Sequence, residues 1–515
     1  MSRARADGTA RRRNQRTKTS VSFGVMLAAV AAAWGTLSLA ALASSRADEI
    51  GLPFSLLNRF FLAAGDQPAT GGEEKAGEDK SDKEENAEEK KTIETEDWNA
   101  HVQSTTVFYG YPPIHSPYVG PQSLPGDGQY KYTESITGFF GMRLPVPGAE
   151  LYYNPEYNSG YGIGETSTTG LAGFPDGDAQ KAGAHFPGRP NIAARLFLRE
   201  TIGFGGGQEA VESDQNQLAG YRDISRLTVT IGKFAIPDLF DDNSYSHDPR
   251  TQFQNWALMD AGAWDYGADQ KGYTHGIALE LNQKDWAVRG GYFSVPRVSN
   301  VNDLSENFTG KYGSFNFEAE DRYTIADQPG VFRVLPWFNR ANMGSYRLAV
   351  ANAATDPLGI NDALDASRKD RTKYGLVLNM EQALSDDLGA FARYSWNDGK
   401  EEIMSFTDIT TSYSAGLSLK GARWGRPDDV VGLAGIVDTI SHQEIGFLKA
   451  GGTGILIGDG QLSHYAPEGI IETYYSLQLT KPLALTFDYQ FFANPAYNQD
   501  RGPVHVFLLR AHLQF

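Results

Sequence analysis

The C-terminal stretch Phe507-Leu-Leu-Arg-Ala-His-Leu-Gln-Phe515 decides the fold class. Its odd-numbered residues are all apolar or aromatic, and Arg510, His512 and Gln514 lie between them. Because successive side chains of a β-strand point to opposite faces, one face of this strand is apolar and the other is mostly polar. The stretch therefore predicts an amphipathic strand that ends on an aromatic residue.

The same period of two recurs from residue 98 onward. Clear runs lie at 192–198, 227–231, 277–281, 413–419, 475–479 and 485–491. Each run belongs to a segment of about ten residues, which is the length that a tilted strand needs to cross membrane hydrocarbon. Tyr and Trp gather near the segment ends, as in an interfacial girdle. A soluble β-sandwich also alternates, but its strands are usually only about five or six residues long.

Connections between these segments alternate between short and long when they are followed backwards from Phe515. The pattern predicts an all-β fold, a transmembrane antiparallel β-barrel of about 16 strands over residues 98–515. Closure removes the strand edges that lipid cannot satisfy, and a barrel of this size encloses a water-filled lumen unless it is plugged. One connection, 204–222, is long where a short turn is expected. We interpret its Gly203-Phe-Gly-Gly-Gly207 as a flexible connection.

Composition excludes several other classes of protein. The 515 residues include no Cys, which excludes a thiolate metal site and a cysteine nucleophile. The formal net charge of −17 argues against a general nucleic-acid binder. The mean hydropathy of −0.40 argues against a polytopic helical membrane protein. A β-barrel remains compatible, because its alternation never raises the average hydropathy.

The first 97 residues are interpreted as two targeting and linking segments. Residues 1–43 combine a basic start, an apolar stretch and the small residues of Ala41-Leu-Ala43, as in a signal peptide; an uncleaved anchor helix is the alternative. Residues 44–97 are interpreted as a largely disordered periplasmic linker. Its acidic part, 66–97, has too few apolar side chains to fold alone, although a charged helix that pairs with another copy is an alternative. We therefore expect export to a bacterial outer membrane.

Four motifs carry a family resemblance. They are Gly232-Lys-Phe-Ala-Ile-Pro-Asp-Leu-Phe-Asp-Asp-Asn-Ser-Tyr-Ser-His-Asp-Pro-Arg250 with Trp264-Asp-Tyr266, then Tyr465-Ala-Pro-Glu-Gly-Ile-Ile-Glu-Thr-Tyr-Tyr475, Asp488-Tyr-Gln490 with Asn494-Pro495, and Gly425-Arg-Pro-Asp-Asp429. As a set, they resemble the carbohydrate-selective porins of the OprB-type family of bacterial outer membranes. The resemblance covers residues 100–515 and implies a sixteen-stranded porin that passes sugars by diffusion. The acidic 66–97 segment is not part of that pattern.

Loop 235–272 is the predicted constriction of the pore. A charged side chain that faces lipid costs free energy, and alternate residues of a strand point to opposite faces. This strand parity assigns Arg195, Arg199, Arg289 and Glu472 to the lumen. The loop adds acids, one base and aromatic rings, which suit the hydroxyl rim and the apolar face of a sugar. Its candidate residues are Asp238, Asp241, Asp242, Arg250, Trp256, Trp264 and Asp265. The alternative is that the wall charges only pair with each other and that the loop composition serves packing.

The leading functional interpretation is a passive porin for sugars and similar small polar solutes. An export barrel for a secreted polysaccharide is the alternative, and a sealed barrel that tethers the envelope through residues 66–97 is a third. We find no hydrolase elbow, zinc-protease motif or phosphate-binding loop, so we predict no enzyme, no cofactor and no metal site. The expected partners are solutes, outer-membrane lipid and, through Phe515, the assembly machinery, with no nucleic acid.

Overall fold

The computed structural model describes residues 93–164, 170–178, 189–306, 308–353, 359–405 and 408–515. The predicted signal peptide and nearly all of the predicted linker therefore lie outside the described residues. Two compact units divide the chain at residues 89 and 90, and everything below concerns the second unit.

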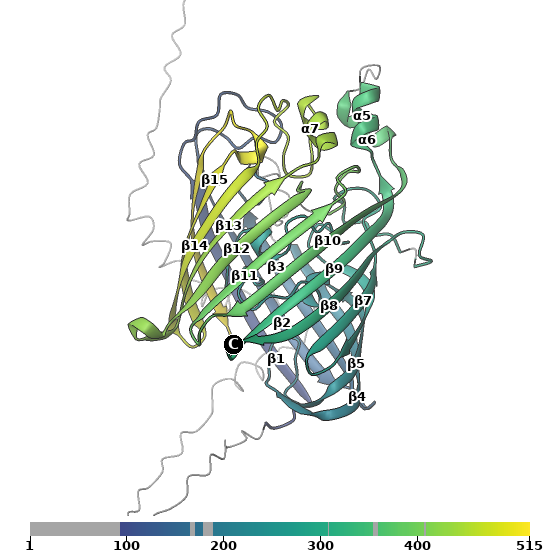
Figure 1. Cartoon of the computed structure of the whole chain (residues 1–515), viewed down its shortest axis with the longest axis vertical. Coiled ribbons are helices and arrows are strands. Elements are labelled where there is room, and N and C mark those ends of the chain that lie inside the picture. Colours follow the sequence, from purple (N-terminus) through teal and green to yellow (C-terminus); the bar gives the residue numbers. More distant parts are fainter. Residues whose placement is uncertain (1–92, 165–169, 179–188, 307, 354–358, 406–407) are drawn as a thin grey trace, which may run out of the picture. The chain divides into compact units, whose positions relative to one another are not determined.

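The second unit is a closed barrel of sixteen antiparallel strands (Figure 1). Each strand pairs with its neighbours in sequence, and β1 pairs with β16 to close the barrel. The strands are β1 Trp98–Tyr111, β2 Gln129–Arg143, β3 Ala149–Tyr161, β4 Arg189–Val211, β5 Gly220–Phe234, β6 Thr274–Asn282, β7 Trp286–Phe293, β8 Gly313–Ile325, β9 Gln328–Met343, β10 Lys369–Ala383, β11 Leu388–Asn397, β12 Thr411–Gly421, β13 Arg426–Thr439, β14 Glu468–Thr480, β15 Leu483–Ala493 and β16 Val504–Gln514. The predicted all-β barrel is confirmed.

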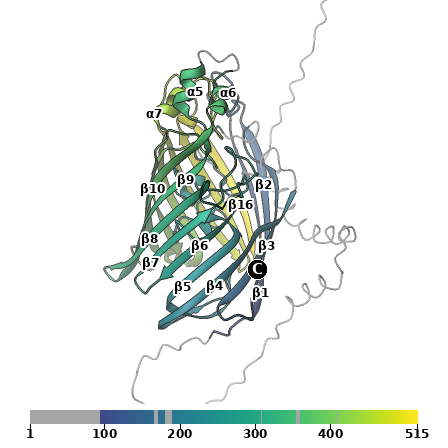
Figure 2. The ribbon, with the colours of Figure 1, turned by 90° about the vertical axis from the view of Figure 1, so that its right-hand side faces the viewer.

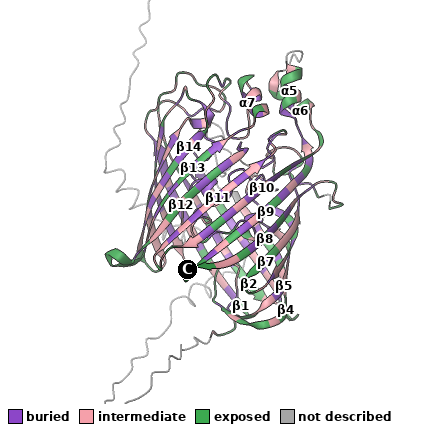
Figure 3. Ribbon diagram, viewed as in Figure 1, coloured by how far each residue is buried: buried purple, intermediate pink, exposed green. Residues whose placement is uncertain are grey.

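Alternating burial along the strands explains why these residues form a barrel (Figure 3). In β16, Phe507 is exposed on the outer face, whereas Arg510 and His512 are buried on the inner face. The backbone closes the ring at the predicted terminal residue: Val102 N–H donates to the Phe515 carbonyl at 3.1 Å, and Phe515 N–H donates to the Val102 carbonyl at 2.9 Å. Every strand edge is thereby paired, as lipid requires.

Short turns lie at one end of the barrel, and long loops with short helices lie at the other. The helices at the loop end are α5 Tyr346–Ala353, α6 Ile360–Ala366 and α7 His442–Lys449 (Figure 1). Within the described ranges, no helix is long and apolar enough to cross a membrane.

The glycine-rich segment 203–207 corrects one sequence-based expectation. It is not a flexible connection but part of β4, which together with β5 extends below the level of the C-terminus (Figures 1 and 2). Gly205, Gly206 and Gly207 all have positive φ, and the β4–β5 register shifts beside them. A local bulge of this kind needs glycine but keeps the strand paired, so only 212–219 is left as the turn.

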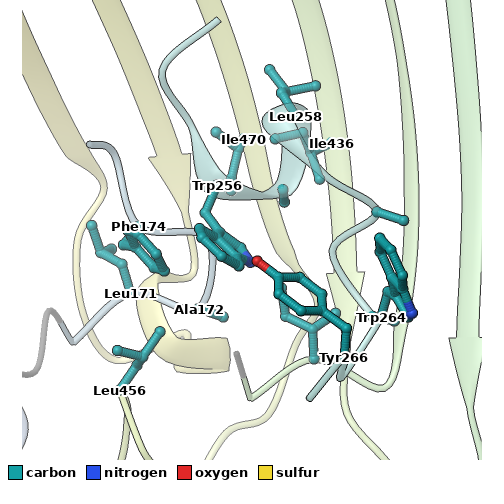
Figure 4. Close-up of a cluster of buried hydrophobic side chains, with 14 of the residues drawn as sticks. Leu171, Ala172, Phe174, Trp256, Leu258, Trp264, Tyr266, Ile436, Leu456 and Ile470 are labelled. Atoms are coloured by element: carbon teal, nitrogen blue, oxygen red, sulfur yellow. The ribbon is translucent and has the colours of Figure 1, made fainter. Parts of the chain in front are cut away.

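The long loop 235–273, here called L3, folds into the lumen and supplies much of its core. Trp256, on the short helix α4 (Trp256–Met259), stacks on Phe174 of the preceding long loop at 4.9 Å between ring centroids (Figure 4). Trp264 packs against Tyr266 at 4.8 Å. Ile436 and Ile470 of the wall complete this cluster. The barrel is therefore not an empty tube, because loops fill part of its interior.

Candidate pore and its constriction

Wall carboxylates hold L3 inside the barrel by accepting its backbone N–H groups. Glu472 of β14 accepts from Gln254 N at 2.6 Å and from Asn255 N at 3.0 Å. Glu318 of β8 accepts from Asp241 N at 2.8 Å, and a third wall glutamate, Glu381 of β10, accepts from Ser244 N. Hydrogen bonds to a charged acceptor are roughly twice as strong as neutral ones. Strands on different parts of the wall therefore fix the path of L3.

Asp241 and Asp265 of L3 serve the same anchoring. The Asp241 carboxylate accepts from Asn379 Nδ2 at 2.6 Å and from Arg393 Nε at 3.2 Å. The Asp265 carboxylate accepts from the backbone N–H of Met404 and lies 3.4 Å from Lys373 Nζ. Both side chains are buried. They hold loop to wall, as Glu472 does, and do not meet the open lumen.

The open part of the lumen is a cavity of about 1040 Å³. Apart from Phe139 of β2 and Gln514 of β16, its lining strand residues come from β4 to β9, and L3 forms the facing side. Six of the eleven predicted site residues line it, namely Arg195, Arg199, Asp238, Asp242, Arg250 and Arg289. The other five, Asp241, Trp256, Trp264, Asp265 and Glu472, are buried away from it. We call this space the lumen cavity.

Arg289 of β7 is the centre of an ion-pair network on the wall. Its guanidinium donates to Glu280 Oε2 at 2.6 Å, to Glu318 Oε1 at 2.6 Å and to Glu320 Oε2 at 2.8 Å. Arg333 of β9 shares Glu320 at 3.0 Å. Adjacent strands thus place cations and carboxylates side by side. The network presents both hydrogen-bond donors and acceptors to the water-filled space.

Contacts of L3 with nearby wall strands and with the preceding loop border the lumen cavity. Arg195 of β4 forms a bidentate pair with Asp238 of L3, at 2.7 and 2.6 Å. Arg250 of L3 lies 2.9 Å from the Asp178 carboxylate on the preceding loop. Tyr273 donates its hydroxyl to Glu156 Oε2 at 2.7 Å. L3, a second loop and the wall therefore meet here, which makes this the constriction candidate.

Charges of both signs line the lumen cavity in nearly equal numbers, nine Arg or Lys against eight Asp or Glu. Because the opposite charges are nearly equal in number, the net electrostatic field in the lumen cavity is weak. The lining therefore offers hydrogen bonds to a solute without strongly preferring cations or anions.

The two tryptophans lie in the packing rather than on the pore surface. Trp256 and Trp264 are each only 2% exposed. Trp264 Nε1 donates to Asn316 Oδ1 of β8 at 3.0 Å. Neither ring presents a free face to a solute in the lumen cavity, so their role in the structure is to shape L3.

Sequence reasoning missed several lining residues, among them Arg322, Arg333 and Asp178. The two arginines lie on β8 and β9, so strand parity applied to these segments could have assigned them to the lumen. Asp178 had no such signal, because only the folded loops bring it to Arg250. Among the described residues, no group of three or more potential ligand side chains could hold a metal ion.

Comparison with known proteins decides the family. The model of the carbohydrate-selective porins, the OprB family, matches residues 149–515. The chain belongs to the OprB family. The resemblance seen in the sequence motifs is thereby confirmed, and with the closed barrel it shows an outer-membrane porin, a channel rather than an enzyme fold.

A solved structure of OprB shares the barrel fold. Pseudomonas putida OprB at high pH is 15% identical, with a TM-score of 0.59 over 81% of this chain and 94% of that chain. The low-pH structure of Pseudomonas putida OprB is 12% identical, with a TM-score of 0.41 over 81% of this chain and 92% of that chain. Identities this low concern the fold alone. No curated protein matches the chain.

Proposed function

We propose that this OprB-family porin passes neutral monosaccharides and similar small polar solutes by diffusion through the lumen cavity. The observation that carries the proposal is the mixed lining of nine basic and eight acidic side chains, several of which form ion pairs within the β4–β9 wall or between the wall and L3. Sugar hydroxyls both donate and accept hydrogen bonds, so paired guanidinium and carboxylate groups suit them without needing a net charge.

Six of the sequence-predicted residues are assigned to the solute path: Arg195, Arg199, Asp238, Asp242, Arg250 and Arg289. The remaining five are assigned to holding L3 in place, because their side chains are buried in its contacts with the wall. Small movements of L3 would change the width of the lumen cavity between L3 and the wall. The buried residues therefore act on solutes indirectly, through the position of the loop.

The same lining weighs against export of an acidic polysaccharide. A polyanion would be favoured by a lumen in which arginine dominates, and here carboxylates such as Glu280 and Glu320 offset the arginines. No catalytic step is assigned to the chain. We assign residues 1–43 to export and Phe515 to recognition by the assembly machinery, with lipid around the exposed outer face of residues such as Phe487 and Phe507.

Liposome swelling tests the proposal. The purified porin is reconstituted, and the liposomes are diluted into isotonic neutral monosaccharides, di- and trisaccharides, and sugar acids. We expect fast swelling with neutral monosaccharides and slower swelling as solute size increases. Liposomes made with heat-denatured protein are the control. Equal rates for all sizes, or no swelling with any sugar, would refute a sugar-sized pore.

A further inference from the structure

The turn 212–219 between β4 and β5 does not hang free below the barrel but folds back into its short-turn mouth. Asn99 Nδ2, on the inner face of β1, donates to the Gln217 carbonyl at 2.7 Å and to Ser213 Oγ at 3.0 Å. Gln215 Nε2 donates to Gln103 Oε1, also on β1, at 2.9 Å. Strand β1 lies three strands away from β4, so the turn reaches across part of the mouth.

The extension of β4 and β5 that carries this turn is bent at three consecutive glycines. Gly205, Gly206 and Gly207 have φ values of 84°, 82° and 93°, and β4 loses register with β5 beside them. The Asp223 carboxylate of β5 accepts from Gly205 N at 2.8 Å and fixes the bend. At the root of the turn, Ala219 N donates to Glu96 Oε2 at 2.9 Å. The long glycine-rich connection 204–222, where the sequence pattern predicts a short turn, thus forms the bent extension of β4 and β5.

The tip of this turn forms one side of the lumen cavity. Asp214, Gln215, Asn216 and Gln217 all line it, together with Arg199 of β4. Arg199 donates to the Asn216 carbonyl at 2.9 Å, and its guanidinium lies 4.9 Å from the centre of the Tyr152 ring. Among the described residues, no carboxylate pairs with Arg199. These two contacts orient the Arg199 guanidinium, while its positive charge has no carboxylate partner within ion-pair distance in the described part of the chain.

Two buried amides beside the tip have unused hydrogen-bonding atoms. Gln103, which is 3% exposed, accepts from Gln215, but its own Nε2 has no partner among the described residues. Asn154 is fully buried and donates to Asn216 Oδ1 at 2.8 Å, while its Oδ1 is unsatisfied in the same part of the chain. Neither Gln103 nor Asn154 lines the lumen cavity, so their role is to hold the tip, through Gln215 and Asn216, at the edge of that cavity.

We propose that the turn 212–219 is a second constriction at the short-turn end, and that it binds neutral polyols. A polyol hydroxyl accepts from Arg199 and donates to the side-chain oxygen of Gln215, and both residues line the lumen cavity. Amides and one oriented guanidinium suit neutral hydroxyl groups better than they suit a cation. The polyol part of the proposal rests on the proposed sugar permeation. The constriction part does not, because it concerns pore width alone.

Single-cysteine labelling tests the constriction, since the natural chain has no Cys. Gln215→Cys and Asp214→Cys place a thiol at the tip. Phe204→Cys places one on the same extension, at a side chain that is 57% exposed and does not line the lumen cavity. Each reconstituted channel is treated with a bulky, charged methanethiosulfonate reagent. We expect the conductance of either tip variant to fall by about twofold or more, with no change for Phe204→Cys. Tip variants that stay unlabelled, or are labelled without a change in conductance, would overturn the proposal.

Sugar titration tests the polyol site. Glucose is added to single channels of the wild type, of Gln215→Leu and of Gln328→Leu, whose amide lies at the start of β9, outside the lumen cavity. We expect the half-blocking concentration to rise about tenfold for Gln215→Leu and to stay unchanged for Gln328→Leu. Equal block in wild type and Gln215→Leu would overturn the polyol site alone. A wild type that glucose never blocks would count against the proposed function, while the labelling result would still decide the constriction.

Discussion

At the scale of single residues, one arginine organises the wall of the pore. Arg289 contacts the carboxylates of Glu280, Glu318 and Glu320. The Glu318 side chain has no solvent exposure, so its charge depends on a partner within the protein. Removing one partner of a buried ion pair costs about 3–5 kcal/mol, because a charge is left uncompensated. The cationic side chain therefore sets both local stability and the sign of the local field.

Replacing Arg289 should change ion selectivity. Arg289→Met leaves three carboxylates with less positive charge beside them, so we expect the permeability ratio of K⁺ to Cl⁻ to rise severalfold. The reversal potential in a KCl gradient measures this ratio. Lys311→Met is the control, since the Lys311 pair with Asp370 is half exposed and outside the lumen cavity. An unchanged reversal potential for Arg289→Met would contradict the assigned network.

A buried acid pair at the loop end should make the local stability of the cap, meaning α7 and the loop before β12, depend on pH. Burial is the main cause that raises the pKa of Glu444 on α7 and of Asp408 in the loop before β12, and the Asp408 charge raises the pKa of Glu444 further. A carboxyl group whose pKa is raised in the folded state stabilises that state while it is protonated. Its contribution to the free energy of unfolding is complete below the ordinary carboxyl pKa of about 4 and is lost as the pH rises through the raised pKa. The local stability of the cap should therefore be higher at acidic pH.

Hydrogen exchange of the α7 amides, corrected for the chemical rate, measures this effect. We expect protection of α7 to decrease between acidic and mildly alkaline pH in the wild type. Glu444→Gln should flatten that dependence, since it removes one of the two titrating groups. A wild-type protection profile that is flat, or that rises with pH, would show that the acid pair does not control the cap.

At the scale of elements, the terminal strand both closes the barrel and ends it. Phe515 pairs with Val102 through two backbone hydrogen bonds, while its side chain is 65% exposed. Deleting Phe515 removes both bonds and the terminal aromatic ring, so we expect less assembled barrel and an unchanged conductance per channel. Heat-modifiable gel mobility measures the assembled fraction. Phe507→Leu, which keeps an apolar outer face, is the control. Normal assembly of the truncated chain would count against this role.

The elements also show how far sequence reasoning reached. Alternation fixed the strands of β16 and its neighbours, because a period of two follows directly from strand geometry. It failed at Gly203–Gly207, where glycines carry no pattern of faces and a bulged strand looks like a loop. It could not place Trp256 or Trp264, because a loop aromatic can face solvent or a core. Only Phe174 and the wall, distant in sequence, decide that Trp256 is buried.

At the scale of the whole molecule, the pore is set to one side of a partly filled barrel. L3 is tied to β8, β10 and β14 by carboxylate anchors such as Glu318, Glu381 and Glu472, and the lumen cavity lies between L3 and β4–β9. Mixed charges line this space, and the turn 212–219 borders it at the short-turn end. The central claim is that this off-centre space conducts and holds neutral sugars.

Single-channel recording in a planar bilayer, with glucose titrated on one side, tests that claim most directly. We expect stable conductance steps in KCl and a current that falls with glucose along a saturating curve, because a sugar in the narrow part obstructs ions. Heat-denatured protein should give no steps. A folded barrel that never conducts would contradict an open lumen cavity. Steps that glucose reduces only as far as it raises the viscosity of the solution would contradict a sugar-holding pore.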